Sequence, residues 1–217
     1  MDLTIGDTQR IIAEGRAQGL LRNQLAYVLA TAFWETARSM EPIKETVMPH
    51  HQDKHPSDAE VIRRLDRAFA KGVLSWVKRP YWRTGFFGRG FVQLTHEANY
   101  KSAGEKLGVD LVGNPGDAMR PEISAKIIVR GMKEGWFTGK KLADYITLSK
   151  SDFRNARRIV NGMDKAREIA ELANRYDDAL RAAGYGTAPP PPPEPSYPTK
   201  PSLWASLRAL WARITGA

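Results

Sequence analysis

The 217-residue sequence contains no cysteine. Disulfide bonds, thiolate metal ligands and a cysteine nucleophile are therefore excluded. No apolar run approaches the roughly 20 residues that a membrane-spanning helix needs. The opening residues, MDLTIGDTQR, lack the apolar stretch of a secretory signal, so we expect a protein made in the cytosol without a signal peptide.

Acidic residues are outnumbered by basic ones. Lys and Arg total 33 against 24 Asp and Glu, which gives a formal net charge of +9. This balance favours an anionic partner, such as nucleic acid, an anionic lipid surface or an acidic cell-wall polymer. The charge alone does not distinguish these three partners.

Motifs for metal, phosphate and serine chemistry are weak or missing. His50, His51 and His55 lie close together, but carboxylates at metal-ligand spacing do not accompany them. We interpret them as part of a solvated loop and expect no metal site. The glycines of residues 85–90 follow the order G-x-x-G-x-G without a following Lys-Ser/Thr, so a phosphate loop is a weak interpretation. No G-x-S-x-G nucleophile elbow occurs.

Helical periodicity dominates residues 1–186, which predicts a mostly α domain. Ser57 is the expected cap of one helix and Thr95 of another. Residues 81–95 are aromatic and rich in glycine, and alternation over residues 91–94 predicts a short hairpin or strand pair. We expect helices over residues 4–19, 23–35, 57–71, 96–107, 121–134, 142–146, 152–160 and 165–183.

The composition changes abruptly after residue 186. Five consecutive prolines begin at Pro189, which predicts a stiff linker over residues 187–201. Residues 202–217 form an amphipathic pattern with basic residues off the apolar face, which suits an anionic membrane surface or a partner groove. The alternative is a helix folded back on the body. The apolar face holds Leu203, Trp204, Leu207, Leu210, Trp211 and Ile214.

Two carboxylates near the second expected helix suggest acid–base chemistry. Glu35 shares a helix face with Val28 and Ala32, at the margin of an apolar stripe. Partial desolvation there favours the protonated form, as a general acid requires. Glu45 follows on a polar loop, and glycoside hydrolysis needs two such carboxyl groups in unlike surroundings. The alternative is that Glu35 is an ordinary solvated flank residue.

The aromatic segment and its continuation suit a sugar cleft. Gln93, Thr95 and Asn99 lie on one short stretch, where a hydroxyl can hold an attacking water and amides can bind N-acetyl groups. Base stacking on a nucleic acid and simple core packing are the alternatives for the aromatic residues. These aromatic residues are Trp76, Tyr81, Trp82, Phe86 and Phe87.

Four motifs resemble glycoside hydrolase family 19 in its phage form, the group of chitinases and endolysins. They are ATAFWETA at residues 30–37, MEPIKE at residues 40–45, GRGFVQLT at residues 88–95 followed by Asn99-Tyr100, and RIVNG at residues 158–162. The third motif is the most specific.

The resemblance covers residues 20–183 and implies a lysozyme-like, two-lobed, mostly helical domain with a small β-hairpin element and a cleft. It also implies that Glu35 is the general acid, that Glu45 is the general base and that Thr95 orients the water. The residues implied to bind sugar are Gln93, Asn99, Tyr100 and Asn161.

Two departures from the family pattern bear on these roles. Trp34 stands where the family has a histidine before the acid. The interval from Glu35 to Glu45 is shorter than in plant chitinases, which leaves Glu41 as an alternative second carboxylate and favours a cell-wall substrate over chitin.

The resemblance thus implies an endolysin that cleaves β-1,4 bonds of peptidoglycan without metal or cofactor. We expect the two carboxyl groups to lie about 6.5–9.5 Å apart. We also expect a monomer that binds glycan strands and no nucleic acid. It would reside in the host cytoplasm before lysis and act on the periplasmic wall. The tail would contact anionic membrane or lipopolysaccharide through Leu203, Trp204, Leu207 and Trp211. A chitinase and a non-catalytic wall-binding module are the alternatives.

Overall fold

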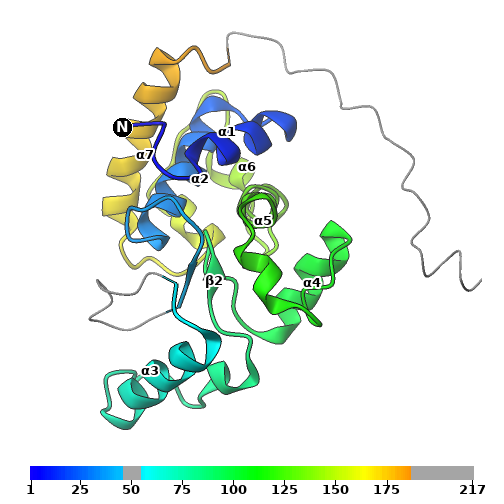
Figure 1. Ribbon diagram of the computed structural model, residues 1–217. Coiled ribbons are helices and arrows are strands. Elements are labelled where there is room, and N and C mark those ends of the chain that lie inside the picture. Colours follow the sequence, from blue (N-terminus) through cyan, green and yellow to red (C-terminus); the bar gives the residue numbers. More distant parts are fainter. Residues whose placement is uncertain (46–54, 187–217) are drawn as a thin grey trace, which may run out of the picture.

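The computed structural model describes residues 1–45 and 55–186 (Figure 1). The predicted linker and tail, with Leu203, Trp204, Leu207 and Trp211, lie outside the described residues, as do His50 and His51. Within the described ranges, no group of three or more His, Asp or Glu side chains is arranged to hold a metal ion. In the same ranges no helix has the length and apolar character that a bilayer span requires.

The described residues form seven α-helices and one two-stranded sheet, which confirms the mostly helical fold class. Three short 3-10 helices connect them. The α-helices are α1 (Thr8–Ala17), α2 (Arg22–Glu35), α3 (Asp58–Ala70), α4 (Glu97–Leu107), α5 (Pro121–Glu134), α6 (Leu142–Tyr145) and α7 (Ala166–Ala182). The 3-10 helices are η1 (Tyr81–Thr84), η2 (Pro115–Met119) and η3 (Asn155–Ile159), and the strands are β1 (Ile43–Lys44) and β2 (Arg89–Gly90).

Helix α2 is the centre of the larger core. The sequence predicts one apolar stripe on this helix, but the residues from Gln24 to Ala32 are all buried. The helix is enclosed because α1, α5 and α7 all pack against it (Figure 1). This burial fixes the direction in which α2 ends, and its last residue is Glu35.

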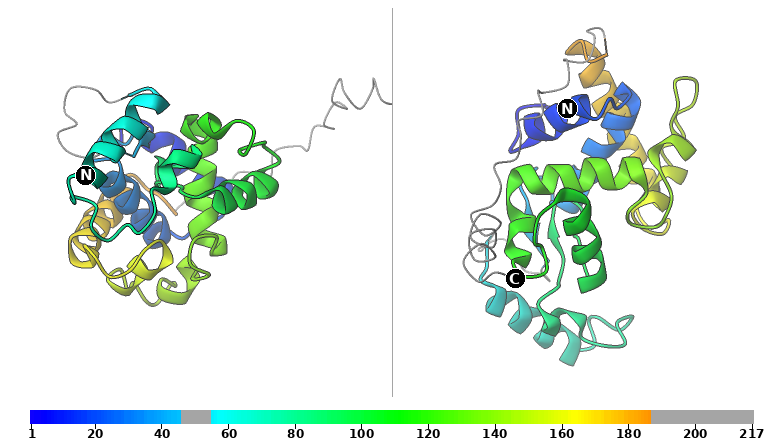
Figure 2. Two further views of the ribbon diagram at one scale, coloured as in Figure 1. Left: turned by 90° about the horizontal axis from the view of Figure 1, so that it is seen from below. Right: turned by 90° about the vertical axis from the view of Figure 1, so that its right-hand side faces the viewer.

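A second, smaller core lies at the other end of the molecule. It is formed where α3 packs against η1, and α3 lies far from α1 and α7 in Figure 1 and in the right-hand view of Figure 2. The two separate cores agree with the predicted two-lobed architecture. The buried residues of this smaller core are Val61, Leu65, Ala68, Leu74, Trp82 and Phe87.

The small sheet differs from the predicted hairpin. Strand β2 pairs antiparallel with β1, more than 40 residues earlier in the chain, with Ile43 opposite Gly90. Residues 91–94 form a turn that a bridge between Arg89 and Leu94 closes. The alternation that suggested a strand reflects burial instead, since Phe91 and Leu94 both pack into the larger core.

One predicted helix cap is confirmed and one is wrong. The Ser57 side chain accepts a hydrogen bond from the Glu60 amide at 3.2 Å, as a cap of α3 should. Helix α4 instead begins after His96, whose φ is +70°. The Thr95 hydroxyl is turned away from the helix, because it donates to the Gln93 carbonyl oxygen at 2.7 Å.

Candidate active site

Glu35 ends α2 at the edge of the larger core, as predicted. Its side chain is 19 % exposed, and its Oε1 accepts a hydrogen bond from Arg157 Nη1 at 2.8 Å. The apolar surroundings expected from the sequence are thus joined by a cation at hydrogen-bond distance.

Arg157 is the functional candidate that the sequence analysis missed. It lies on η3, its side chain is 4 % exposed, and its Nε donates to the Asp164 carbonyl oxygen at 3.0 Å. It directly precedes the motif of residues 158–162, and its neighbour Arg158 is exposed. The motif was therefore a signal for this loop, but it did not reveal which arginine points inward.

Asn161 belongs to the same loop. Its backbone amide donates to the Arg157 carbonyl oxygen at 3.0 Å, and its side-chain Oδ1 accepts from the Gly162 backbone amide at 2.8 Å. Its side chain is exposed, so sugar binding by Asn161 stays a prediction. We refer to Glu35, Arg157 and Asn161 as the Glu35 cluster.

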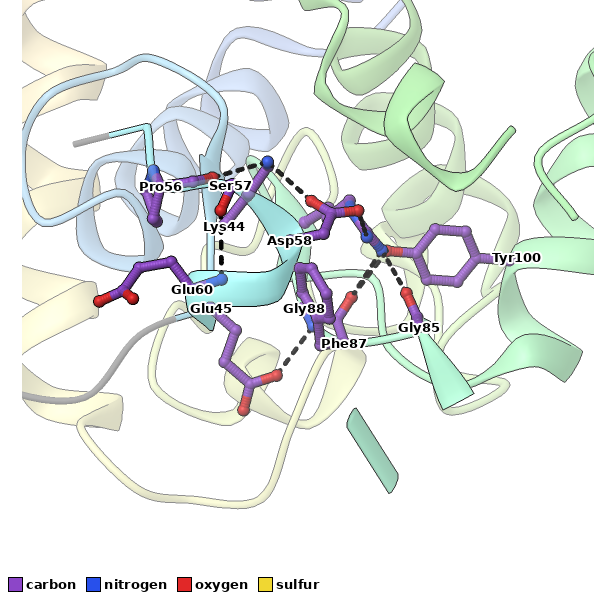
Figure 3. A network of polar contacts seen from close by, with 11 residues as sticks. Lys44, Glu45, Pro56, Ser57, Asp58, Glu60, Gly85, Phe87, Gly88 and Tyr100 are labelled. Carbon is purple, nitrogen blue, oxygen red and sulfur yellow. Dashed lines mark hydrogen bonds and ion pairs between the residues drawn. The ribbon is translucent and has the colours of Figure 1, made fainter. Parts of the chain in front are cut away.

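Glu45 directly follows β1, and the opposite segment of the chain holds it in place. Its amide donates to the Gly88 carbonyl oxygen at 2.7 Å, and its Oε2 accepts from the Gly88 amide at 2.8 Å (Figure 3). Its Oε1 accepts from the Tyr81 hydroxyl at 2.5 Å. Each oxygen has a further lone pair, so the carboxylate can still accept a proton from water.

Gly88 is the point where Glu45 and Gln93 approach the same backbone. A Cβ at Gly88 would lie 2.8 Å from Gln93 Oε1 and 3.2 Å from Glu45 Cβ. A side chain there would displace both residues. Gln93 Nε2 donates to the carbonyl oxygens of Ile43 and Gly90 at 3.1 and 3.2 Å, so this amide also ties the two strands together.

Thr95 and Asn99 extend this group along the chain. Besides its bond to Gln93, Thr95 accepts a hydrogen bond at its carbonyl oxygen from Asn99 Nδ2, at 2.7 Å. The Thr95 hydroxyl oxygen keeps its lone pairs, with which it can orient a water. Asn99 is exposed. We refer to Glu45, Tyr81, Gln93, Thr95 and Asn99 as the Glu45 cluster.

Tyr100 does not contact solvent, which corrects its implied role in binding sugar directly. Its side chain is 0 % exposed, and its hydroxyl donates to the Phe87 carbonyl oxygen at 2.7 Å and accepts from Arg89 Nη1 at 3.0 Å. Burial raises the pKa of Tyr100 to about 12. Tyr100 therefore holds residues 87–89 in place, where the GRG segment (residues 88–90) begins.

A charged network next to Glu45 joins the smaller lobe to the sheet (Figure 3). Asp58, the first residue of α3, pairs with Arg89 Nη2 and Lys44 Nζ, both at 2.7 Å. Partial burial opposes the charge on Asp58, but the hydrogen bonds and charges of Lys44 and Arg89 outweigh it and lower its pKa. The Arg89 side chain is only 1 % exposed and lies 3.7 Å over the Phe87 ring.

The structure thus gathers the predicted residues into two groups, each with one carboxylate. The carboxylate of the Glu35 cluster faces a cation, and that of the Glu45 cluster faces two neutral donors. Glu41, the alternative second carboxylate, is half-buried and makes no side-chain hydrogen bond to the described residues. Two carboxyl groups in such unlike surroundings can divide proton donation and proton acceptance between them.

Known proteins match parts of this chain. The family model of class I chitinases, glycoside hydrolase family 19, matches residues 74–132. Rice "Chitinase 8" is 60 % identical over 30 residues, which cover 14 % of this chain and 12 % of the rice protein. The tomato "Acidic 27 kDa endochitinase" is 56 % identical over 50 residues, or 23 % of this chain and 20 % of that protein.

The matched part is short relative to these proteins, since the chain spans a fifth or less of their length. A solved structure, the crystal structure of a chitinase C mutant, aligns with a TM-score of 0.46 and 22 % identity over 84 % of both chains. The family match includes the GRG segment and most of the Glu45 cluster. Over residues 74–132, this chain is therefore similar to glycoside hydrolase family 19, the family of the class I chitinases.

Proposed function

We propose that this protein is an endolysin-type glycosidase that hydrolyses β-1,4 bonds of bacterial peptidoglycan. The observation that carries the proposal is the pair of carboxylates in unlike surroundings. Glu45 is held by Gly88 and Tyr81 on the segment that matches the family, and Glu35 lies at a helix end beside Arg157.

The proposed reaction inverts the sugar centre. Glu35 protonates the leaving glycosidic oxygen while Glu45 takes a proton from a water oriented by Thr95 on the opposite sugar face. The water oxygen bonds to the sugar carbon as the glycosidic bond breaks. Arg157 then stabilises the carboxylate that Glu35 becomes, which accounts for a cation beside a proton donor.

Peptidoglycan is the favoured substrate for two reasons. The net charge of +9 suits a polymer that carries peptide carboxylates. The residues from Met40 to Glu45 also resemble the endolysin branch, and the interval between the two carboxylates is short. Either the muramic-acid or the glucosamine bond can be the one cleaved, and a transglycosylase product is the alternative outcome to hydrolysis.

The first prediction tests the two carboxylates. Glu35→Gln and Glu45→Gln should each lower the release of reducing ends from purified peptidoglycan by at least about 100-fold, because each removes one proton-transfer group. Glu41→Gln is the matched control and should retain activity. Equal thermal melting of the variants would show that folding is unchanged.

Two results would contradict these roles. Retained cleavage by Glu35→Gln removes Glu35 as the acid. Loss of activity in Glu41→Gln, with retention in Glu45→Gln, makes Glu41 the second carboxylate. An intact wild-type protein that binds the wall without cleaving any bond would instead be the non-catalytic module.

A chitinase is the second candidate, because the matched rice and tomato proteins are named chitinases. The two activities separate on substrate. Chitin oligomers and purified peptidoglycan are digested in parallel, and mass spectrometry identifies the products. A higher kcat/KM on chitin oligomers than on peptidoglycan would make chitin the substrate in place of peptidoglycan.

The place of action belongs to the same proposal. We infer a monomer that resides in the host cytoplasm and reaches the periplasmic wall at lysis. The tail, residues 202–217, would bind anionic membrane or lipopolysaccharide, because its sequence combines an apolar face of Trp and Leu with Arg residues outside that face.

A further inference from the structure

Tyr81 is the residue of the Glu45 cluster whose contacts the sequence analysis did not foresee. It opens η1, and its ring packs edge-on against Trp82 at 5.2 Å and against His96 at 4.8 Å between centroids. Trp82 belongs to the smaller core, and His96 precedes α4. The ring is therefore held from two parts of the fold, and its hydroxyl points at Glu45.

The two hydrogen bonds on Glu45 act on different oxygens. The Gly88 amide holds Oε2, and the Tyr81 hydroxyl holds Oε1. A carboxylate held at one oxygen can still rotate about that contact, whereas one held at both keeps a single plane. Among the described residues, Tyr81 and Gly88 are the donors recorded for this side chain.

We propose that Tyr81 is the positioning residue of the general base: its hydroxyl fixes the Glu45 carboxylate in the plane from which it takes a proton from water. This role rests on the proposed glycosidase function. It requires a hydroxyl that remains protonated. Burial, followed by the hydrogen bond and the charge of Glu45, raises the pKa of Tyr81 above its ordinary value, so the phenol stays a donor at neutral pH.

Other titratable or charged groups surround this contact and bear on any pH dependence. His96 touches the Tyr81 ring, and Tyr100 interacts electrostatically with Glu45. Next to them lies the network of Lys44, Asp58 and Arg89. Tyr81→Phe keeps all of these side chains. A difference between the pH profiles of the wild type and this variant therefore reports the Tyr81 hydroxyl.

Tyr81→Phe is the test, because phenylalanine keeps the ring and its packing. The assay measures kcat and KM on whichever polymer the wild-type protein cleaves, peptidoglycan or chitin oligomers. We expect kcat to fall about tenfold with KM unchanged, since a lost hydrogen bond to a charged group is of that size. The kcat–pH profile of Tyr81→Phe should differ from that of the wild type, because the proposed base loses one of its two donors.

A matched control removes a phenol hydrogen bond elsewhere. The Tyr185 hydroxyl donates to the Leu20 carbonyl oxygen at 3.2 Å, in the larger core. Tyr185→Phe should lower the melting temperature without changing kcat or the pH profile. If it changes kcat as much as Tyr81→Phe does, the effect of Tyr81 is one of general stability and the proposal is overturned.

The double variant separates positioning from a direct role. If Tyr81 acts through Glu45, Tyr81→Phe should have no further effect in a Glu45→Gln background. An additional loss there overturns the proposal. A wild-type profile in Tyr81→Phe, with Glu45→Gln inactive, removes Tyr81 but leaves the proposed function intact. Absence of cleavage by the wild-type protein on both polymers refutes the proposed function itself.

Discussion

At the scale of single residues, the two carboxylates are distinguished by what donates to them. Glu35 is paired with a buried guanidinium, and Glu45 is held by a backbone amide and a phenol. A guanidinium places a full positive charge beside a carboxylate, whereas a backbone amide and a phenol that hold separate oxygens fix its orientation. Arg157 should therefore influence catalysis through charge and Tyr81 through geometry.

The residue-scale prediction concerns Arg157. Arg157→Met should lower kcat and change the alkaline limb of the pH–rate profile, because the cation beside the proposed proton donor is lost. Stability should fall by about 3 kcal/mol, since the change breaks an ion pair that is largely buried. Urea unfolding and pH–rate measurements check both effects.

The neighbouring arginine provides a matched control for this experiment. Arg158 is exposed, so Arg158→Met should leave the profile and the stability nearly unchanged. Arg157→Lys keeps the charge and should retain more of the wild-type profile than Arg157→Met. An alkaline limb that stays in place in Arg157→Met would contradict the electrostatic role.

At the scale of elements, the start of α3 is tied to the sheet by charge as well as by packing. Asp58 begins the helix, and its two cationic partners, Lys44 and Arg89, lie on β1 and β2. Lys44 Nζ also donates to the Pro56 carbonyl oxygen at 2.8 Å. The smaller lobe is thereby fixed against the strand after which Glu45 lies.

Asp58→Asn provides the element-scale prediction. The folded-state pKa of Asp58 is lowered, so its stabilising effect is present above its unfolded pKa of about 3.9 and is lost as pH falls through the folded value. We expect the variant to lose about 1 kcal/mol at pH 7, a value discounted because the side chain is 52 % exposed. The difference from wild type should narrow below about pH 4.

Urea unfolding between pH 3 and pH 7 measures this difference. Asp178→Asn is the control, because Asp178 is 75 % exposed and pairs only weakly with Arg181 at 3.7 Å. A loss in Asp58→Asn that is independent of pH would show that the Asp58 carboxylate contributes by shape or helix capping and not by charge.

At the scale of the whole molecule, the described members of both hydrophobic cores lie within the first 185 residues. The larger core ends at Tyr185, and the smaller one lies between Val61 and Phe87. The residues assigned to acid–base chemistry lie in the same part of the chain. Folding and hydrolysis should therefore not require the proline-rich segment or the amphipathic tail.

Deletion of residues 188–217 tests the division of roles. The shortened protein should hydrolyse purified wall at the wild-type rate but bind anionic vesicles more weakly, because it loses an apolar face flanked by arginines. Co-sedimentation with anionic and with neutral vesicles measures the binding. Equal sedimentation of the full and shortened proteins with anionic vesicles would contradict the role of the tail.

The sequence by itself determined the local features of this protein. Helical periodicity predicted the course of α5, and a short polar side chain before an acidic turn predicted the Ser57 cap. The position of Glu35 at a helix end followed from the same spacing. These features depend on residues a few positions apart, whose relative placement the backbone hydrogen bonds of a helix already define.

Only the tertiary structure decided which distant groups meet. It paired β2 with β1 and not with residues 91–94, and it enclosed Tyr100 while leaving Asn99 exposed. It also turned Arg157 and not Arg158 toward Glu35. These choices depend on how two cores pack around a short sheet, and spacing along the chain carries no information about the direction from which a remote donor arrives.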